Sequence, residues 1–153
     1  MKVITFSKNS LPYAWCSNMS HYPIYFHDKR WFHTEGLFQA LRFDDETIIE
    51  AIRNERNPIK AKQIALDNAD KMVVTPRSKT DIENMRLCLM IKLDQYPVLK
   101  IELDETEDGI IIEDVTSRQS SESNSFWGAA LINGEWVGEN TLGKLWMQIR
   151  DRK

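Results

Sequence analysis

Residues 31–43 read WFHTEGLFQALRF, and this stretch decides the fold of the first half of the chain. Two aromatic residues open it, and Leu37 and Leu41 then recur at the spacing of a helix face. Because residues three and four apart share one face of a helix, the stretch predicts an amphipathic helix that Thr34 caps. Glu35 is then expected in the first helical turn.

Outward from this stretch, short extended segments and helices alternate along the chain. Aromatic and β-branched residues predict strands, and apolar residues at helical spacing predict helices. The expected strands are residues 3–6, 22–26, 31–32, 110–115, 126–132 and 135–137. The expected helices begin near residues 34, 45, 58, 80, 97 and 141. The pattern therefore predicts a mainly α protein of the α+β class with a small antiparallel β component.

Local signals mark several turns and helix ends. Residues 80–83 read TDIE and match a capping box, and the Asn-Pro pair at 57–58 combines an N-cap with proline at the first helical position. The Asn-Gly pair at 133–134 supplies the positive φ angles of a type I′ hairpin turn. Asn140 is the expected N-cap of the last helix, and the serine-rich residues 117–125 predict a polar loop.

Composition indicates one soluble core. The chain has 153 residues, 42% of them hydrophobic and 28% charged, which suits a single domain. The formal charge of -3 argues against a broad electrostatic grip on nucleic acid, so any such contact should be local. No apolar run approaches the roughly 20 residues that cross a bilayer, and the N-terminus lacks an export signal. A cytoplasmic protein without membrane contact is therefore expected.

Cysteine and histidine spacing predicts neither a disulfide framework nor a metal site. Cys16 and Cys88 lie far apart and are expected to be reduced packing residues. The spacing of His21, His27 and His33 matches no familiar set of metal ligands. No glycine-rich phosphate loop occurs either, so the chain is expected to need no metal and no cofactor.

A carboxylate and an amide share one face of the first predicted helix. Glu35 and Gln39 are four residues apart, which brings their side chains together on the helix surface. The pattern alone favours an exposed polar face of an amphipathic helix over a functional site.

Three segments resemble, in the same order, the signatures of the NADAR family, also called YbiA-like. Residues 31–43 are similar to its Glu-x-x-x-Gln-Ala-x-Lys-Phe motif, and residues 16–24 resemble its Ser-Asn-Phe and Tyr-Pro-Ile segment. Residues 126–128 and 138–150 are similar to its Trp-Gly motif and its Gly-x-Asn-x-Leu-Gly-x-x-Leu-Met-x-x-Arg motif. The resemblance spans nearly the whole chain and implies a single YbiA-like helical domain over residues 1–153.

The chain departs from the family pattern at three of the quoted positions. Gly36 stands where the family commonly has His, Arg42 where it has Lys, and Asn124 where it commonly has Asp. These differences indicate a divergent branch.

The resemblance implies hydrolysis of an N-glycosidic bond to ribose, and three functions are open. The first, which we favour, is removal of ADP-ribose from guanine bases of DNA. It would release ADP-ribose and reverse a DNA ADP-ribosyltransferase toxin, with this chain as the antitoxin of a DarTG-type pair. The second is hydrolysis of phosphorylated riboflavin-biosynthesis intermediates. The third is a catalytically weak ADP-ribose-binding module, which Gly36 and Asn124 make plausible.

The resemblance makes Glu35 the candidate catalytic carboxylate. Breaking the bond between ribose C1′ and nitrogen builds positive charge on the sugar, and a nearby carboxylate stabilises that charge or activates water. In the first helical turn, the helix dipole favours the ionised carboxylate. The leaving nitrogen then needs a separate proton donor. Asn124 cannot transfer a proton as Asp would, so either another group donates or Asn124 only orients the substrate.

An amine route stays open beside the carboxylate route. A lysine that attacks the opened sugar would form a Schiff base. The candidates for this amine are Lys144, Lys62 and Lys29, between which the sequence does not discriminate.

Further residues are candidates for substrate contact. Trp127 and Gly128 offer stacking and a close backbone approach to a base, although Trp127 fits a core position equally well. Asn140 opens the last helix, whose N–H groups can face a phosphate, or it is simply an N-cap. The family motifs add Asn18, Gly36 and Gln39. A solvated helix face is favoured over DNA contact for the basic cluster Arg53, Arg56, Lys60 and Lys62.

Overall fold

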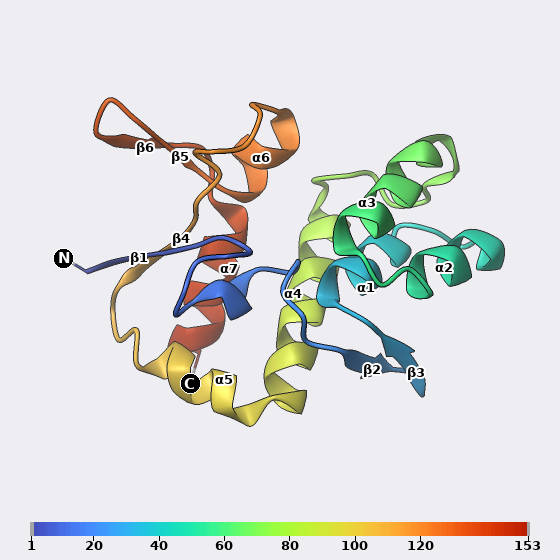
Figure 1. Ribbon diagram of the computed structural model, residues 1–153, viewed down its shortest axis with the longest axis horizontal. Helices are drawn as coiled ribbons and strands as arrows, with labels where there is room; N and C mark the ends of the chain where they lie inside the picture. Colours follow the sequence, from blue (N-terminus) through green and yellow to red (C-terminus); the bar gives the residue numbers. More distant parts are fainter. Residues whose placement is uncertain (1, 153) are drawn as a thin grey trace. The chain divides into compact units, whose positions relative to one another are not determined.

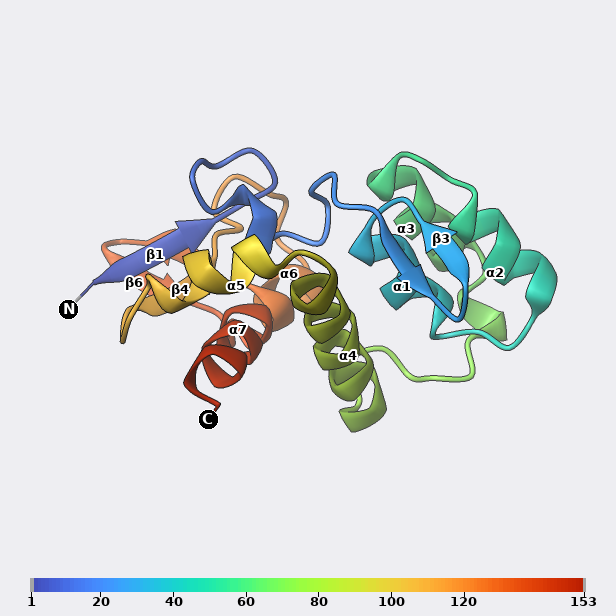
Figure 2. The same ribbon diagram turned by 90° about the horizontal axis from the view of Figure 1, so that it is seen from below.

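The structure is a computed structural model that describes residues 2–152 (Figures 1 and 2). The chain divides into two units. The central unit is the continuous segment Asn18–Gln95, and the terminal unit combines Met1–Ser17 with Tyr96–Lys153. The single domain expected over the whole chain stays a prediction. Helices dominate both units, and small sheets accompany them, which confirms the mainly α, α+β fold class.

Four helices and one hairpin build most of the described central unit. The helices are α1 (Thr34–Ala40), α2 (Glu46–Arg53), α3 (Pro58–Asp67) and α4 (Lys79–Gln95), with the short 3-10 helix η2 (Ala69–Lys71) before α4. α1 packs against α2, α3 and α4 (Figure 1). Because three helices surround it, every residue of α1 is buried.

The hairpin of the central unit has a tighter turn than the sequence predicts. Strands β2 (Ile24–Phe26) and β3 (Lys29–Trp31) pair antiparallel. The turn consists of His27 and Asp28, whose φ angles of 49° and 62° suit a type I′ turn. The polar turn was expected at residues 27–30, but residues 29 and 30 belong to β3.

His33, rather than the expected Thr34, caps α1. The Nδ1 atom of His33 accepts the N–H of Gly36 at 2.9 Å. The Thr34 hydroxyl lies inside the helix and contacts the backbone oxygen and side-chain oxygen of Asn18 at 3.3 and 3.2 Å. The capping expectation at Thr34 was wrong because an imidazole can accept the same hydrogen bond from one position earlier.

The other helix starts follow local polar side chains. Asn57 caps α3, as the sequence predicts, and Asp45 caps α2 at the expected start of that helix. α4 begins at Lys79, and Ser78 accepts the N–H of Asp81 through its hydroxyl at 3.2 Å. The capping box expected at residues 80–83 was therefore placed two residues too late, since Ser78 supplies an earlier acceptor.

The terminal unit combines the two ends of the chain. Its described elements are β1 (Val3–Phe6), η1 (Ala14–Cys16), α5 (Pro97–Asp104), β4 (Ile110–Glu113), α6 (Glu122–Trp127), β5 (Ala130–Ile132), β6 (Glu135–Val137) and α7 (Thr141–Asp151). α7 packs on β4, and its Trp146 is fully buried. The Trp146 indole donates to the backbone oxygen of Cys16 at 3.0 Å and meets the Trp15 ring edge-on at 5.2 Å.

Two parts of the terminal unit differ from the sequence prediction. β1 and β4 pair parallel, whereas the expected β component is antiparallel. A parallel pair needs a long crossover, and here the crossover holds the entire central unit. Residues 122–127 form α6, capped by Ser121, where a polar loop and the start of a strand were expected. The strand begins only at Ala130, beyond Gly128.

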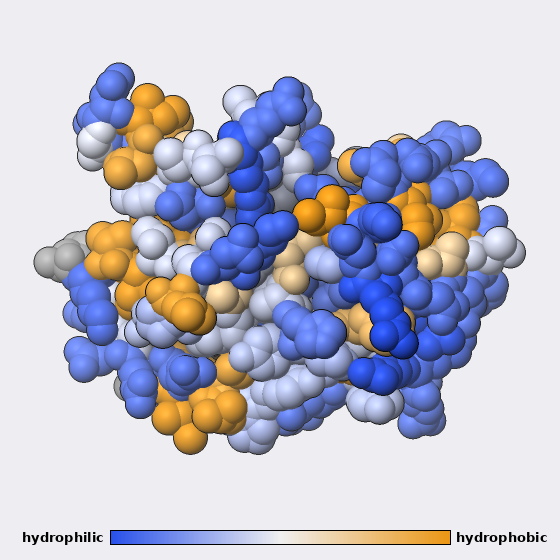
Figure 3. Space-filling view, in the orientation of Figure 1, coloured by the Kyte–Doolittle hydropathy of each residue, from blue (hydrophilic) through white to orange (hydrophobic). Residues whose placement is uncertain are grey.

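The β5–β6 hairpin confirms the Asn-Gly turn. Asn133 and Gly134 have φ angles of 51° and 80°. The hairpin leaves Leu131, Ile132 and Val137 about half exposed, and apolar colour gathers over it in Figure 3.

Within residues 2–152, no helix is long and apolar enough to span a membrane. The same range contains no cluster of three or more His, Cys, Asp or Glu side chains that could hold a metal ion.

Candidate active site

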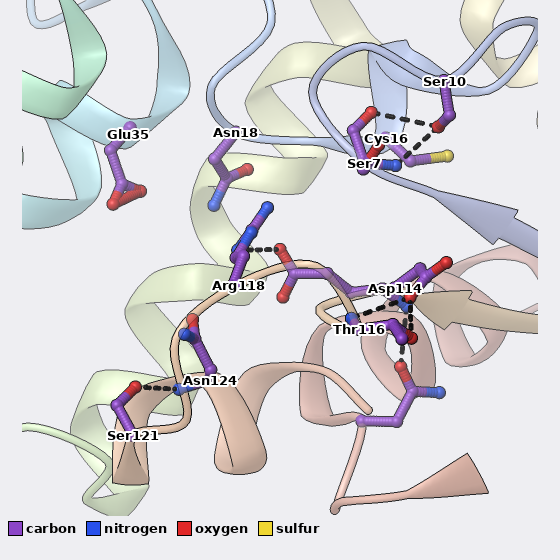
Figure 4. A network of polar contacts seen from close by, with 12 residues as sticks. Ser7, Ser10, Cys16, Asn18, Glu35, Asp114, Thr116, Arg118, Ser121 and Asn124 are labelled. Carbon is purple, nitrogen blue, oxygen red and sulfur yellow. Dashed lines mark hydrogen bonds and ion pairs between the residues drawn. The ribbon is translucent and has the colours of Figure 1, made fainter. Parts of the chain in front are cut away.

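Glu35 and Gln39 are buried in the central unit. The prediction of an exposed polar face, which rested on their spacing, was therefore wrong. Glu35 is 7% exposed and Gln39 is 2% exposed. The backbone N–H of Glu35 donates to the backbone oxygen of Asn18 at 3.1 Å. Figure 4 shows the Glu35 carboxylate and the Asn18 amide turned to the same side of the central unit. Amphipathic spacing could not reveal this burial because α1 is enclosed on more than one side.

Four side chains of the central unit form a continuous polar series, here called the relay: Glu35, Gln39, Arg42 and Asp81. The Gln39 amide nitrogen donates to Glu35 Oε1 at 3.1 Å, and Arg42 Nη1 donates to the Gln39 oxygen at 3.1 Å. Arg42 also donates through Nε and Nη2 to both oxygens of Asp81, at 2.9 and 2.8 Å. The relay thus connects a carboxylate on α1 to a carboxylate on α4.

The imidazole of His33 lies at the start of α1, beside the relay. Its Nε2 lies 3.1 Å from the backbone oxygen of Glu55, while Nδ1 accepts the N–H of Gly36. Since Nδ1 must accept, we assign the proton to Nε2, where it donates to Glu55. Burial lowers the pKa of His33, although the bond to Glu55 and the charge of Glu35 act in the opposite direction. His33 is therefore held as a neutral cap.

Gly36 fits closely against this cap. A Cβ atom at position 36 would lie 3.1 Å from His33 Cε1 and 3.2 Å from His33 Nδ1, so the ring would have to shift. The N–H of Gly36 is already donated to His33, and contact of Gly36 with a substrate stays a prediction. The departure from the family pattern at position 36 thus accompanies the imidazole cap.

The surroundings of Glu35 also include Asn18, Met85 and Cys88. Asn18 is 5% exposed, and its amide nitrogen lies 2.9 Å from the Met85 sulfur. Burial raises the pKa of the Cys88 thiol, and the negative charges of Glu35 and Asp81 raise it further. Cys88 is therefore a neutral packing residue, and it is free, as the sequence predicts.

In the terminal unit, Asn140 has a structural task that the sequence does not predict. Its φ angle is 52°, and its side chain makes no capping bond to α7. Instead the amide donates to the backbone oxygen of Ile111 at 2.8 Å and accepts the N–H of Glu113 at 3.0 Å. Gly143 lies directly against this bridge, where a Cβ would collide with the Ile111 oxygen and the Asn140 amide. The Asn-x-x-Gly part of the motif thus fastens α7 to β4.

Trp127 and Gly128 end α6 and pack beside β4. Trp127 is 7% exposed and meets the Phe126 ring edge-on at 4.9 Å. A Cβ on Gly128 would lie 2.7 Å from the backbone oxygen of Glu113 and from Val115 Cγ1, so this close approach requires glycine. Both residues have a core role in the structure, and their contact with a substrate stays a prediction.

Asn124 and Lys144 occupy more open positions of the terminal unit. Asn124 donates through its amide to the backbone oxygen of Gln119 at 2.7 Å, and its N–H donates to Ser121 at 3.0 Å (Figure 4). Lys144 is exposed on α7. No contact of either side chain with Glu35 is seen among the described residues, so both catalytic assignments stay predictions.

Besides the burial of Asp81, sequence reasoning did not predict the burial of two further charged residues. Glu113 ends β4 with a side chain only 9% exposed, and its carboxylate lies 3.6 Å from Arg118. Lys92 on α4 is the one buried lysine among residues 2–152, with Nζ 3.0 Å from Ser20 Oγ and 4.9 Å from the Tyr22 ring centroid. Glu113 follows an isoleucine run, and Lys92 lies between apolar helix positions. These apolar neighbours were the sequence signal that could have indicated the burial of Glu113 and Lys92.

The fold and the buried carboxylate define an α+β protein with a polar site on its first helix, and comparisons name the family. Residues 5–152 match the NADAR domain, and the chain belongs to this family. It is similar to N-glycosidase YbiA of Escherichia coli K12, with 29% identity over 150 residues that cover 98% of this chain and 88% of the relative. N-glycosidase YbiA of Shigella sonnei matches with the same identity and coverage.

The fold has a solved counterpart as well. The NMR structure of the E. coli protein YbiA is similar with a TM-score of 0.80 and 29% identity, covering 99% of this chain and 84% of that one. Family membership and these relatives support a general N-glycosidase function.

Proposed function

We propose that this chain is an N-glycosidase that removes ADP-ribose from guanine bases of DNA and so reverses the product of a DNA ADP-ribosyltransferase toxin. The buried Glu35 carboxylate, held by the Gln39 amide at 3.1 Å, carries the proposal. The names of the relatives support the reaction class.

The geometry of Glu35 suits this reaction. Gln39 engages Oε1, which leaves Oε2 to face C1′ of the ribose. As the C1′–N bond breaks, the carboxylate stabilises the positive sugar or takes a proton from the attacking water. The water oxygen joins C1′, and the guanine nitrogen leaves with the bonding electrons and takes up one proton. The products are ADP-ribose and intact guanine.

Neighbouring amides are proposed to orient the sugar. Gln39 has two amide hydrogens, of which one is directed at Glu35, so the other can meet a ribose hydroxyl. We also assign substrate contact to Asn18, because its backbone oxygen accepts the N–H of Glu35 and Asn18 therefore lies beside Glu35. In the terminal unit, Asn124, Trp127, Gly128, Asn140 and Lys144 stay candidates on the family motifs alone.

A basic surface of the central unit favours DNA over a small metabolite as substrate. The guanidinium carbons of Arg30 and Arg56 lie 5.3 and 5.0 Å from the centroid of the Phe32 ring, and both arginines are exposed. Exposed guanidinium groups bind phosphate oxygens readily, and the Phe32 ring holds both of them on one surface. Arg53 is excluded from this surface because Glu50 already holds its guanidinium.

The test incubates the protein with an oligonucleotide that carries ADP-ribose on guanine and measures released ADP-ribose by mass spectrometry. Wild type and Glu50→Gln are expected to release it at the same rate, and Glu35→Gln is expected to release it about 10²- to 10⁴-fold more slowly. Release by Glu35→Gln at the wild-type rate would remove Glu35 from the reaction. Cleavage of a phosphorylated ribosylamine intermediate in place of the oligonucleotide would overturn the DNA substrate. Binding of ADP-ribose without cleavage of either substrate would show a binding module.

A further inference from the structure

The relay ends in an ion pair that is almost fully removed from water. The side chains of Arg42 and Asp81 are 6% and 0% exposed, and they meet through two hydrogen bonds at 2.9 and 2.8 Å. The backbone N–H of Arg77 donates to Asp81 at 2.8 Å, which fixes the carboxylate further. The Arg42 guanidinium also lies 4.7 Å from the centroid of the Phe38 ring. Both members of the pair are therefore held in one orientation.

Stability alone does not account for this ion pair. Removing two charges from water costs as much as their attraction returns, and well-packed apolar residues of similar volume commonly serve as well. A buried pair therefore calls for a use of its directional bonds. The nitrogen of Arg42 that does not contact Asp81, Nη1, points to the Gln39 oxygen at 3.1 Å.

This third bond decides which way the Gln39 amide faces. Arginine is only a donor, so the group that Gln39 turns toward Arg42 must be its oxygen. The amide nitrogen must then face Glu35, an acceptor when ionised. The reversed amide would place N–H groups against the guanidinium and an oxygen against the carboxylate. Arg42 thus excludes the orientation that would repel Glu35.

We infer that Arg42 and Asp81 are a positioning pair for Glu35: Asp81 orients Arg42, Arg42 orients the Gln39 amide, and Gln39 fixes the carboxylate for catalysis. This inference rests on the proposed catalytic role of Glu35. Neither Arg42 nor Asp81 needs to touch the substrate in this arrangement.

The test replaces both charges together, since removing one would leave the other buried without its partner. The double variant Arg42→Met/Asp81→Asn keeps the volume at position 42 and an acceptor for the Arg77 N–H. We expect it to fold, with kcat reduced roughly tenfold to a hundredfold and KM changed by less than about twofold. Combined with Glu35→Gln, the double variant should lower kcat no further, because the two changes act through the same carboxylate.

Arg53→Met is the matched control. Arg53 holds Glu50 with the same two-bond geometry, at 2.8 and 2.8 Å, in the same unit but outside the relay. It is expected to keep wild-type kcat. Wild-type kcat in the folded double variant, or an effect that simply adds to that of Glu35→Gln, would overturn the positioning role. Wild-type kcat in Glu35→Gln would instead remove Glu35 from the reaction, and absence of cleavage by the wild-type protein would overturn the proposed function.

A readout without substrate tests the orientation itself. The side-chain amide protons of Gln39 should give two distinct NMR signals in wild type, which shift in Glu35→Gln and exchange faster with water in the double variant. Unchanged Gln39 signals in the folded double variant would overturn the inference even if no substrate were cleaved.

Discussion

The central and terminal units both bury polar side chains, but they use them differently. In the central unit, the relay directs donors from Arg42 through Gln39 onto the Glu35 carboxylate. In the terminal unit, Asn140 and Trp146 donate to backbone oxygens of β4 and η1, and Asn140 also accepts a backbone N–H of β4. Both sets fall within segments that resemble family motifs. Shared motifs therefore mark a residue as needed, without telling whether it serves chemistry or architecture.

Glu35→Gln, in the central unit, should have the largest effect, and the effect should be on the reaction rate rather than on folding. Glutamine has the shape of glutamate and can still accept the Gln39 N–H, so the fold should persist. We expect kcat to fall by about 10²- to 10⁴-fold, the usual effect of losing a catalytic acid or base. Rates on the modified oligonucleotide, read beside thermal unfolding, check this. A loss of folded protein in proportion to the loss of rate would show a structural role instead.

Asn140→Ala should give the opposite pattern in the terminal unit. It removes two buried hydrogen bonds and should lower the free energy of unfolding by about 2–4 kcal/mol, measured by denaturant titration. The rate per folded molecule should stay close to wild type. Asn133→Ala is the control, because Asn133 shares the positive φ but lies exposed in a turn. A raised KM with unchanged stability would show substrate contact by Asn140.

Lowering the pH should weaken the α1 cap of the central unit. The folded-state pKa of His33 lies below its ordinary value of 6.5, so the unfolded chain binds a proton more readily. Its contribution to stability is then complete above pH 6.5 and is lost as the pH falls through the folded-state pKa, by at most about 1.4 kcal/mol per pH unit. Unfolding titrations at pH 7.5 and 5.5 measure this loss.

His33→Asn is the matched variant for this pH effect. Asparagine is a good N-cap and does not titrate, so the variant should lose less stability between the two pH values than wild type. An equal loss in both proteins would assign the pH dependence to another group.

The smallest effect is expected at the exposed ion pair of α2. The hydrogen bond from Arg53 lowers the pKa of Glu50 to about 2, yet the Glu50 side chain is 37% exposed. Solvent screens such a pair, so Glu50→Gln should change the free energy of unfolding by less than about 1 kcal/mol. A larger loss, in the same denaturant titration, would show that exposure is a poor guide to which ion pairs matter here.

Local chemistry explains which parts of the fold could be predicted. Asp45, Asn57 and the Asn133-Gly134 turn act on their own neighbours, so their sequence signals sufficed. α6 was missed because its cap, Ser121, stands among other serines that resemble a loop. The parallel pairing of β1 with β4 joins distant segments, and no local signal reports it.

The site was predictable only in part. Spacing alone placed Glu35 on an exposed face, and the family resemblance made it a candidate. Asp81 was expected only as part of the capping box at residues 80–83, a pattern that concerns Thr80 and Glu83 and assigns Asp81 no partner. Its role as the partner of Arg42 depends on the packing of α1 against α4. Burial of this kind is a property of the folded chain rather than of any short stretch.

The β1–β4 pair imposes an order on the folding of the protein as it is synthesised. β1 leaves the ribosome before the central unit, and its partner strand follows roughly 100 residues after β1. The segment Asn18–Gln95 is continuous and contains its own helical contacts, so it can fold while the rest is still being made. Once the central unit is folded, the loop between β1 and β4 is effectively shorter, so pairing the two strands costs less loop-closure entropy. The strand that precedes the central unit in the chain is therefore paired only after that unit has been made.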